Sequence, residues 1–389
     1  MKIGVVVQRY GEEVLGGSES LCREISRRLG RRGYEVTVFT TCARDYVTWA
    51  NEYPPGETES GGVRIRRFAS ERQRDIRQFN AFSEDFFRSG TGNPALQEEW
   101  IDRQGPYCPA LLKALERADR EMDLFLFFTY LYYPVVKGIR VVTRPAFLFP
   151  TAHDEPPLYL PVVREVFVRP RGLFFLTRAE MEFVRQTFRL PAEKLILSRT
   201  GIETVEPVPR GRFRERYALP GPYLLYAGRI EKGKGLDTLF EGFRRLEKPS
   251  DLTLALIGKK LMEIPAVEGI RYLGFVPDRD KLAGFRDALF SVQPSALESL
   301  SITTLESWSQ RTPVLVNGQS AVLREHVESS RGGRIYRDVE DFTRQAARMI
   351  RRGGERNRMG RRGHRYVRRN YAWEPVMQII TRHIGAPAE

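Results

Sequence analysis

Short apolar runs alternate with amphipathic stretches along the first half of the chain. The runs are typical of buried strands, which we expect at 2–8, 35–41, 63–68, 124–129, 146–151, 172–176 and 195–198. Apolar residues recurring every three or four positions predict helices between them, at 18–32, 71–88, 109–120, 134–143 and 178–188. Apolar strands that alternate with helices predict a parallel sheet covered on both faces.

This alternation is interrupted at 206–222, where four prolines stand among Arg and Gly in the composition of a linker. It then restarts, with strands expected at 223–227, 252–257, 270–273, 290–293 and 313–316 and helices at 236–246, 281–288 and 301–310. We therefore predict two doubly wound α/β domains, 1–205 and 223–372, with a C-terminal helix in 373–389 that returns to the first. Such domains bind ligands beyond the carboxyl ends of their strands, so we expect them to face a shared cleft.

Composition and charge narrow the class of protein. The chain has 389 residues, 41% of them hydrophobic, and a net charge of +14, whereas residues 1–205 hold 30 Lys and Arg against 27 Asp and Glu. Much of the excess lies in 344–369, with eleven arginines and one acid, either a solvated helix face or a patch for an anionic surface. No zinc spacing or RNA-binding signature accompanies it, so we expect no nucleic-acid partner.

The cysteines and the N-terminal residues indicate the cellular compartment in which we expect the protein. The three cysteines, Cys22, Cys42 and Cys108, form neither a CxxC pair nor a disulfide framework. The run Lys2–Val7 is typical of a buried strand rather than a signal peptide. We expect a cytoplasmic protein, with the inner face of a membrane as a candidate location.

The first candidate site is the stretch Gly228-Arg229-Ile230-Glu231-Lys232-Gly233-Lys234-Gly235, between a predicted strand and a predicted helix. Backbone amides and the dipole at a helix N-terminus favour an anion, and Arg and Lys add charge-assisted contacts to phosphate oxygens. This pattern indicates a phosphate site that would stabilise a diphosphate leaving group. A basic surface loop is the alternative.

The second candidate site is the stretch from Pro294 to Glu306. Glu298 falls in a loop after a strand, whereas Glu306 falls in the next helix, for which Ser301 is the expected N-cap. Two carboxylates at one strand end can accept hydrogen bonds from the hydroxyls of a sugar and a ribose. The spacing alone is common by chance.

Together these stretches resemble the family 4 retaining glycosyltransferases, which have the GT-B fold of two Rossmann-like domains. The matches are Gly228-Arg229, Lys234-Gly235, Pro294-Ser295, Glu298, Glu306 and Thr312-Pro313-Val314. The resemblance implies that Arg229 and Lys234 bind the donor diphosphate, that Glu298 contacts the donor sugar and that Glu306 holds the ribose. It also implies that the backbone of Ser299, Leu300, Ser301 and Ile302 faces the donor. Ser301 stands where the family commonly has glycine.

The resemblance extends to other parts of the chain. Gly16 and Gly17 match the glycine loop that approaches the donor, and His153, after a strand, matches a histidine near the reacting sugar. Satisfied polar packing is the alternative for His153. We also count Gly228 and the loop residue Phe275 among the donor-binding residues.

The acceptor site is expected in the first domain. An insertion at 72–120 carries Trp100 and Tyr107, which we expect to border the cleft and contact the acceptor; packing within the insertion is the alternative. Phe79, Phe82 and Phe86 form a helical stripe there, either core or a contact with a membrane.

The expected function is retaining transfer of a hexose-type sugar from a nucleotide diphosphate sugar, UDP- or GDP-linked, to a hydroxyl of a glycan, lipid-linked or small acceptor. The sequence has no acidic metal-binding motif, so we expect no metal and no other cofactor. A catalytically silent relative that binds sugars or acts as a scaffold is the alternative from another class. A phosphorylase or an epimerase is the alternative among enzymes of this fold.

Overall fold

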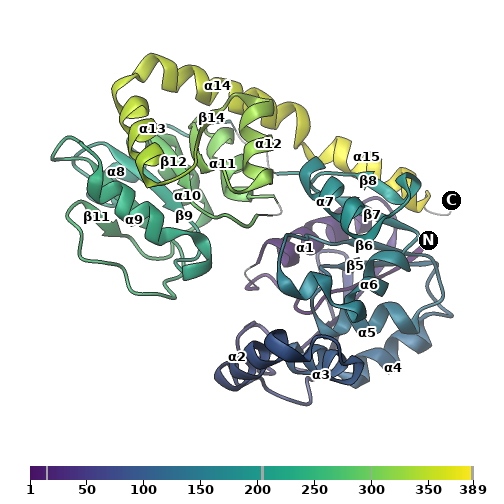
Figure 1. Ribbon diagram of the computed structural model, residues 1–389. Helices are drawn as coiled ribbons and strands as arrows, with labels where there is room; N and C mark the ends of the chain where they lie inside the picture. Colours follow the sequence, from purple (N-terminus) through teal and green to yellow (C-terminus); the bar gives the residue numbers. More distant parts are fainter. Residues whose placement is uncertain (15, 203–205, 299, 387–389) are drawn as a thin grey trace. The chain divides into compact units, whose positions relative to one another are not determined.

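The computed structural model describes residues 1–14, 16–202, 206–298 and 300–386, and the chain folds into two compact units (Figure 1). The first unit comprises Met1–Arg199 and Val376–Glu389, and the second comprises Thr200–Pro375. The residues of the predicted linker, 206–222, fall inside the second unit. The expected linker is partly structured, because 212–216 form a short helix whose Phe213 is buried in the second unit.

The first unit is built on an eight-stranded sheet with the order β3-β4-β2-β1-β5-β6-β7-β8. All neighbours pair in parallel except β3 and β4. The strands are β1 (Lys2–Val6), β2 (Glu35–Thr41), β3 (Gly56–Ser60), β4 (Val63–Phe68), β5 (Leu124–Phe128), β6 (Ala146–Phe149), β7 (Gly172–Phe175) and β8 (Leu195–Leu197).

Helices cover this sheet with their apolar sides, and an extensive apolar cluster of the unit lies between several of them and the strands. They are α1 (Gly17–Gly30), α2 (Ile76–Asp85), α3 (Pro94–Gln104), α4 (Pro109–Ala118), α5 (Tyr133–Val141), α6 (Pro161–Val168) and α7 (Arg178–Phe188). The C-terminal α15 (Trp373–Ile384) also packs here, where Tyr34 Oη donates to the carbonyl of Gly385 at 2.7 Å.

The second unit is built on a six-stranded parallel sheet with the order β11-β10-β9-β12-β13-β14. Counted along the chain within the unit, this is the 3-2-1-4-5-6 order of the Rossmann fold. The strands are β9 (Tyr223–Ala227), β10 (Thr253–Ile257), β11 (Ile270–Tyr272), β12 (Phe290–Gln293), β13 (Val314–Asn317) and β14 (Gly333–Tyr336).

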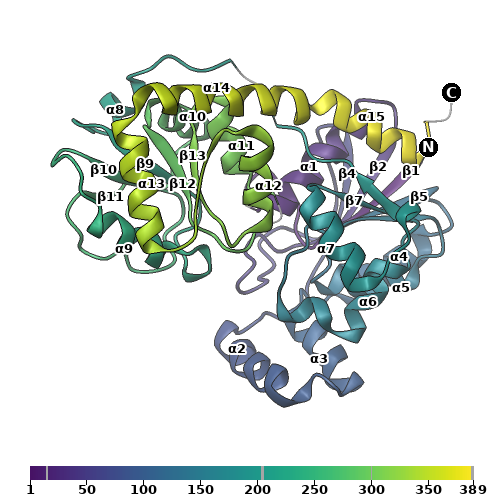
Figure 2. The same ribbon diagram turned by 45° about the horizontal axis from the view of Figure 1, so that its top comes forward.

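The helices of the second unit lie between or beside its strands and bury two apolar clusters against the sheet. They are α8 (Arg212–Arg216), α9 (Leu236–Arg245), α10 (Asp278–Asp287), α11 (Ile302–Ser309), α12 (Ala321–Ser330), α13 (Val339–Arg351) and α14 (Gly353–Asn370). Figure 2 shows α14 as a long helix along the edge of this unit.

The two passages of the chain between the units are joined to each other. The backbone N–H of Ile202 donates to the carbonyl of Tyr371 at 2.8 Å. A Cβ at Gly201 would lie only 2.1 Å from the ring of Trp373, so the outgoing and returning segments pack in direct contact. Among the described residues, no helix has both the length and the apolar character needed to cross a membrane.

Candidate active site

The ends of β9 and β12 define the site in the second unit. These strands are neighbours in the sheet. After β9 the chain continues to β10 on one side of the pair, and after β12 it continues to β13 on the other side. In open α/β sheets such a switch point is where ligands bind, because the two loops diverge and leave a crevice. The loop 228–235 follows β9 and the loop 294–301 follows β12, so both predicted motifs meet here.

Lys234 and Glu298 are in direct contact although 64 residues separate them. Lys234 Nζ donates to Glu298 Oε1 at 2.9 Å, and their side chains are 27% and 15% exposed. Lys234 ends the short 3-10 helix Lys232–Lys234, just before α9. A half-buried cation and carboxylate at a switch point are thus available for an anionic group and for hydroxyl groups.

Gly235 explains how the two loops come so close. Its φ is +69°, and a Cβ there would lie 2.3 Å from the carbonyl oxygen of Pro294. Any other residue would force the loops apart. Asn317, at the end of β13, holds the same carbonyl, because its Nδ2 donates to Pro294 O at 2.9 Å.

Arg229 lies in a loop that continues the pairing of β9 with β10. Ile230 N–H donates to the carbonyl of Lys259 at 2.8 Å, and Leu261 N–H donates to the carbonyl of Ile230 at 2.9 Å. Arg229 contacts Glu231 at 3.1 Å. The backbone pairing fixes the loop from which the guanidinium extends. It also gives the backbone of Lys259 and Lys260 a structural role.

The loop before α11 presents the expected backbone segment. Ser301 adopts a left-handed conformation with φ +63°, which is the reason that a glycine suits this position. It precedes the helix as predicted, but it makes no hydrogen bond to the backbone as an N-cap; its Oγ contacts Thr304 Oγ1 at 2.9 Å instead. Leu300 O accepts from His326 Nε2 at 2.8 Å, and Ile302 begins α11. Ser299 lies outside the described residues.

Glu306 is paired with a lysine that the sequence did not single out. Lys281 Nζ donates to Glu306 Oε1 at 2.7 Å and also contacts Asp278 at 3.0 Å. Burial lowers the pKa of Lys281, but the two carboxylates raise it above its ordinary value, so the lysine stays protonated. The other carboxylate oxygen, Glu306 Oε2, is buried without a hydrogen-bond partner among the described residues. Positions 281 and 306 share no local pattern, so only the fold reveals the pair.

Two further predicted donor residues lie at the same edge of the sheet. Gly228 directly follows β9, and its N–H donates to Ile257 O at 3.0 Å. Phe275 follows β11, where the neighbouring Gly274 accepts from Gly258 N–H at 2.9 Å. The ring of Phe275 is 67% exposed, which makes it an apolar surface beside the strand ends.

In the first unit, His153 lies beyond the end of β6 beside a second carboxylate. Its Nε2 is 3.4 Å from Glu155 Oε2, and Tyr130, beyond the end of β5, donates a short hydrogen bond to Glu155. Burial raises the pKa of Glu155, but the contacts with His153 and Tyr130 outweigh it and hold the pKa below its ordinary value. An ionised carboxylate therefore orients the imidazole.

The segment that carries His153 is held by Glu180 of α7. Glu180 Oε1 accepts from Ala152 N–H at 2.8 Å, and Oε2 accepts from Leu176 N–H at 3.0 Å. Burial raises the pKa of Glu180 from 4.5 to about 8, against the effect of these hydrogen bonds. The carboxyl thus ties together the ends of β6 and β7.

This raised pKa predicts a pH dependence of stability. The folded protein retains a proton that the unfolded chain releases near pH 4.5, so this contribution is complete below that pH and is lost as the pH rises through about 8. We expect Tm to decline between these values more steeply in the wild type than in Glu180→Gln. The variant is less stable throughout, because its amide nitrogen cannot accept a hydrogen bond. Parallel Tm profiles would contradict the assignment.

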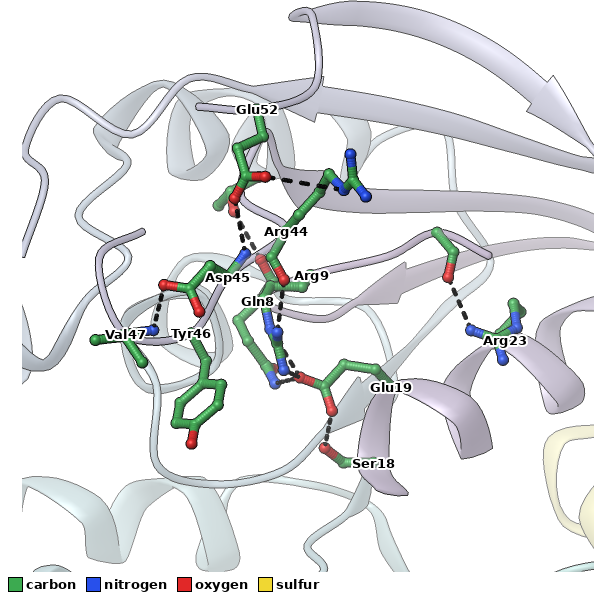
Figure 3. A network of polar contacts seen from close by, with 12 residues as sticks. Gln8, Arg9, Ser18, Glu19, Arg23, Arg44, Asp45, Tyr46, Val47 and Glu52 are labelled. Carbon is green, nitrogen blue, oxygen red and sulfur yellow. Dashed lines mark hydrogen bonds and ion pairs between the residues drawn. The ribbon is translucent and has the colours of Figure 1, made fainter. Parts of the chain in front are cut away.

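The glycine loop of the first unit encloses a buried ion pair (Figure 3). Glu19 of α1 accepts from Gln8 Nε2 at 2.9 Å and from Arg9 Nε at 3.0 Å, and Ser18 Oγ donates to its other oxygen. A Cβ at Gly16 would lie 2.1 Å from that oxygen, whereas Gly17 has open space around it. Gly16 is therefore required by packing within this unit, and contact of both glycines with the donor stays a prediction.

The structure corrects the prediction for Trp100. The side chain is 2% exposed, and its ring packs against Phe79, Phe86 and Phe87 while Nε1 donates to Ser83 Oγ at 3.0 Å. With its faces covered and its N–H satisfied, it packs the insertion and offers no surface to an acceptor.

Tyr107 and two residues of the phenylalanine stripe, Phe79 and Phe82, are less buried than Trp100. Tyr107 is half-buried between Tyr133 and the guanidinium of Arg72, so its acceptor role stays a prediction. Phe79, Phe82 and Phe86 face the apolar cluster of the unit, as the core interpretation expects.

Comparison with known proteins identifies relatives of this chain. Residues 221–352, which include the loops of the second unit described above, match the family model for Glycosyl transferases group 1. The D-inositol 3-phosphate glycosyltransferase of Xylanimonas cellulosilytica is 25% identical over 346 residues, covering 80% of this chain and 78% of that protein. The corresponding enzyme of Frankia alni is 25% identical over 334 residues, covering 79% of each.

Solved structures show the same fold at low sequence identity. Sucrose-phosphate synthase from Thermosynechococcus elongatus superposes with a TM-score of 0.73 at 16% identity over 98% of each chain. Anabaena HepE in complex with UDP-glucose superposes with a TM-score of 0.71 at 14% identity over 99% of each chain. The predicted fold class, GT-B with two Rossmann-like domains, is confirmed, and the matches support a glycosyltransferase.

Proposed function

We propose that this chain is a retaining glycosyltransferase that moves a hexose-type sugar from a UDP- or GDP-sugar to an acceptor hydroxyl. The observation that carries the proposal is the contact between Lys234 and Glu298 at the switch point of a Rossmann-type sheet. A nucleotide diphosphate sugar offers an anion to the lysine and hydroxyls to the carboxylate in the same molecule. The relatives in Xylanimonas cellulosilytica and Frankia alni are D-inositol 3-phosphate glycosyltransferases, which supports the same reaction class.

The donor would extend along the strand ends of the second unit. Arg229 and Lys234 bind its diphosphate, and the backbone before α11 adds amides at a helix N-terminus. Glu306 Oε2 accepts from a ribose hydroxyl, which supplies the partner that this oxygen lacks among the described residues. The exposed ring of Phe275 offers a surface for the base.

The reaction would need no separate base. The acceptor oxygen bonds to the anomeric carbon as the bond to the phosphate oxygen breaks, and the acceptor proton passes to that phosphate oxygen on the same face of the sugar. Arg229 and Lys234 stabilise the charge that develops on the leaving diphosphate, which is metal-independent chemistry. Glu298 and His153 orient the sugar.

Turnover of nucleotide sugars separates this proposal from a catalytically silent relative. Purified protein is incubated with UDP-glucose, UDP-galactose, UDP-N-acetylglucosamine and GDP-mannose, with chelator present, and released nucleoside diphosphate is measured. We expect release from at least one donor, by hydrolysis when no acceptor is supplied. Binding of nucleotide without release from any donor, with or without simple glycoside and inositol phosphate acceptors, would favour the silent relative.

Lys281 gives a further prediction about the ribose contact. In Lys281→Met, Glu306 loses the cation that opposes its burial, and burial already raises the pKa of this carboxyl. The carboxyl then accepts a ribose hydroxyl less well, and we expect UDP or GDP affinity to fall roughly tenfold, the scale for one charge-assisted hydrogen bond. Titration calorimetry measures the change.

Lys113→Met is the matched control, because Lys113 is an exposed lysine of α4 in the other unit. It removes the same charge without touching Glu306, so nucleotide affinity should not change. If Glu306 binds the ribose, a second result is expected. The Lys281→Met substitution should lower the affinity for 2′- and 3′-deoxy nucleotides less than it lowers the affinity for the ribonucleotide. An equal loss for all three nucleotides would show that Lys281 acts elsewhere.

A further inference from the structure

The strongest charged feature outside the proposed site is one face of α14. Six of its arginines are exposed, and no Asp or Glu occurs from position 356 to 373. At 3.6 residues per turn the six fall within an arc of about 120°, and they extend over about 17 Å of the helix. We call this set the arginine face; it consists of Arg358, Arg361, Arg362, Arg365, Arg368 and Arg369.

The orientation of the arginine face is fixed by the opposite side of the helix. A Cβ at Gly360 would lie 2.0 Å from the carbonyl oxygen of Arg311, and one at Gly363 would lie 2.2 Å from the ring of Trp308. Met359 and Val367 are buried on the same side. The helix backbone therefore rests directly on its unit and cannot rotate, so the six guanidinium groups must point outward.

These charges are not neutralised within the described part of the chain. Glu355, the single acidic residue of the helix, forms ion pairs with Arg334 and Arg348 outside the arginine face. The distance from Arg348 Nη2 to Glu355 Oε1 is 3.2 Å. No guanidinium group of the arginine face forms an ion pair or a hydrogen bond with another described residue. Like charges so close together destabilise a fold unless an external anion compensates them, which indicates a partner.

A cavity at one end of the arginine face adds to this surface. It has a volume of about 350 Å³ and lies between α12, β14, α13 and α14. Arg358 and Arg362 line it together with Arg331, Arg334 and the carboxylate Glu355, which is paired with Arg334. Arg334 Nε is buried without an acceptor among the described residues. Guanidinium groups that converge on a hollow of this size suit a phosphate group.

We propose that the arginine face docks the second unit on a membrane surface rich in anionic phospholipids, with a lipid phosphate entering the neighbouring cavity. A straight row of outward arginines matches a flat anionic surface, to which each cation near the headgroups adds attraction. Among the described residues, α14 exposes no large apolar side chain, so the contact is electrostatic and does not involve insertion.

Nucleic acid fits this surface less well. Its single-stranded forms are held by aromatic rings between the cations, and the one aromatic residue of α14, Tyr366, packs against Trp308 and Tyr371. The arginine face is also confined to one helix, with no second element that would enter a groove of a duplex. Duplex DNA is therefore the comparison ligand in the test.

The test is co-sedimentation of the full chain with vesicles of phosphatidylglycerol and phosphatidylcholine in equal parts, and with phosphatidylcholine alone. We expect binding only to the anionic vesicles, and a steep loss of binding as salt is added. The triple variant Arg361→Gln, Arg365→Gln, Arg368→Gln should bind them on the order of 100-fold more weakly. Its Tm should be equal to or above that of the wild type, because all three side chains are exposed and fewer like charges repel one another.

The matched control removes three exposed arginines of the first unit: Arg117→Gln, Arg120→Gln and Arg189→Gln. It has the same net charge as the test variant and should retain binding within a few-fold. An equal loss in both variants would mean that net charge alone attracts the protein, and would overturn the proposal. Absence of binding to anionic vesicles, or tighter arginine-dependent binding to duplex DNA at the same salt concentration, would overturn it as well. None of these outcomes depends on glycosyl transfer, so the two proposals fail separately.

Discussion

Lys234→Ala is expected to lower the rate of glycosyl transfer by roughly 100-fold or more, the scale for losing one preorganised group that stabilises transition-state charge. The loss should appear mainly in kcat, because negative charge on the diphosphate grows as the glycosidic bond breaks. Arg229→Ala is expected to have an effect of the same order. Steady-state release of nucleoside diphosphate measures both.

The ion pair between Lys234 and Glu298 gives a further prediction about the same site. Lys234 holds Glu298 at 2.9 Å, so donor binding must share the lysine between the carboxylate and the diphosphate. The double variant Lys234→Ala, Glu298→Ala should therefore lose less than the sum of the two single losses in activation free energy. Lys260→Ala is the control, since this lysine pairs with Glu263 on the surface and should retain full rate. Wild-type turnover in both Arg229→Ala and Lys234→Ala, with folding confirmed by Tm, would refute the diphosphate site.

The second large effect is that substitution of Glu298 should lower the rate, whereas substitution of Glu306 should lower nucleotide affinity. Glu298→Gln should lower kcat on the order of 100-fold, because an amide orients the donor sugar less strongly, while affinity for free UDP or GDP stays nearly unchanged. Glu306→Gln should weaken nucleotide affinity roughly tenfold and change kcat little. Turnover and calorimetric titration of both variants measure the two effects.

Gln preserves shape, so packing is a weak alternative explanation for either effect. Glu231→Gln is a suitable control for Glu298→Gln, because Glu231 is a carboxylate of the facing loop 228–235 and contacts Arg229 instead of Lys234. It should alter nucleotide affinity or rate only modestly. If Glu298→Gln and Glu306→Gln lose nucleotide affinity equally, the assignment of one to the sugar and the other to the ribose is wrong.

Strands with continuous apolar sequence were predicted well, because they are buried on both faces and nothing competes with their pattern. The strands at 35–41, 223–227 and 290–293 have the predicted bounds. So does the strand at 63–68, although it holds three arginines and is only partly buried. The edge strand Gly56–Ser60 was missed because its residues are mostly exposed and polar, and only pairing with its antiparallel neighbour makes it a strand.

For the site, sequence could identify loops but not contacts between them. A glycine-rich basic loop after a strand carries its own chemical signal, and so does a carboxylate loop that precedes a helix. The contact of Lys234 with Glu298, and that of Lys281 with Glu306, depends on strand order, which no local pattern encodes. For Trp100 the sequence predicted a ligand contact, but the side chain is buried. An aromatic residue among arginines has the same sequence pattern whether it binds a ligand or packs in a core.

Hydrogen–deuterium exchange with and without UDP or GDP locates the bound nucleotide without relying on any substitution. We expect slower exchange on ligand addition in 228–235 and in the first turn of α11, with little change across the insertion at 72–120. Protection confined to the first unit, or none in either loop at a nucleotide concentration that raises Tm, would contradict this prediction.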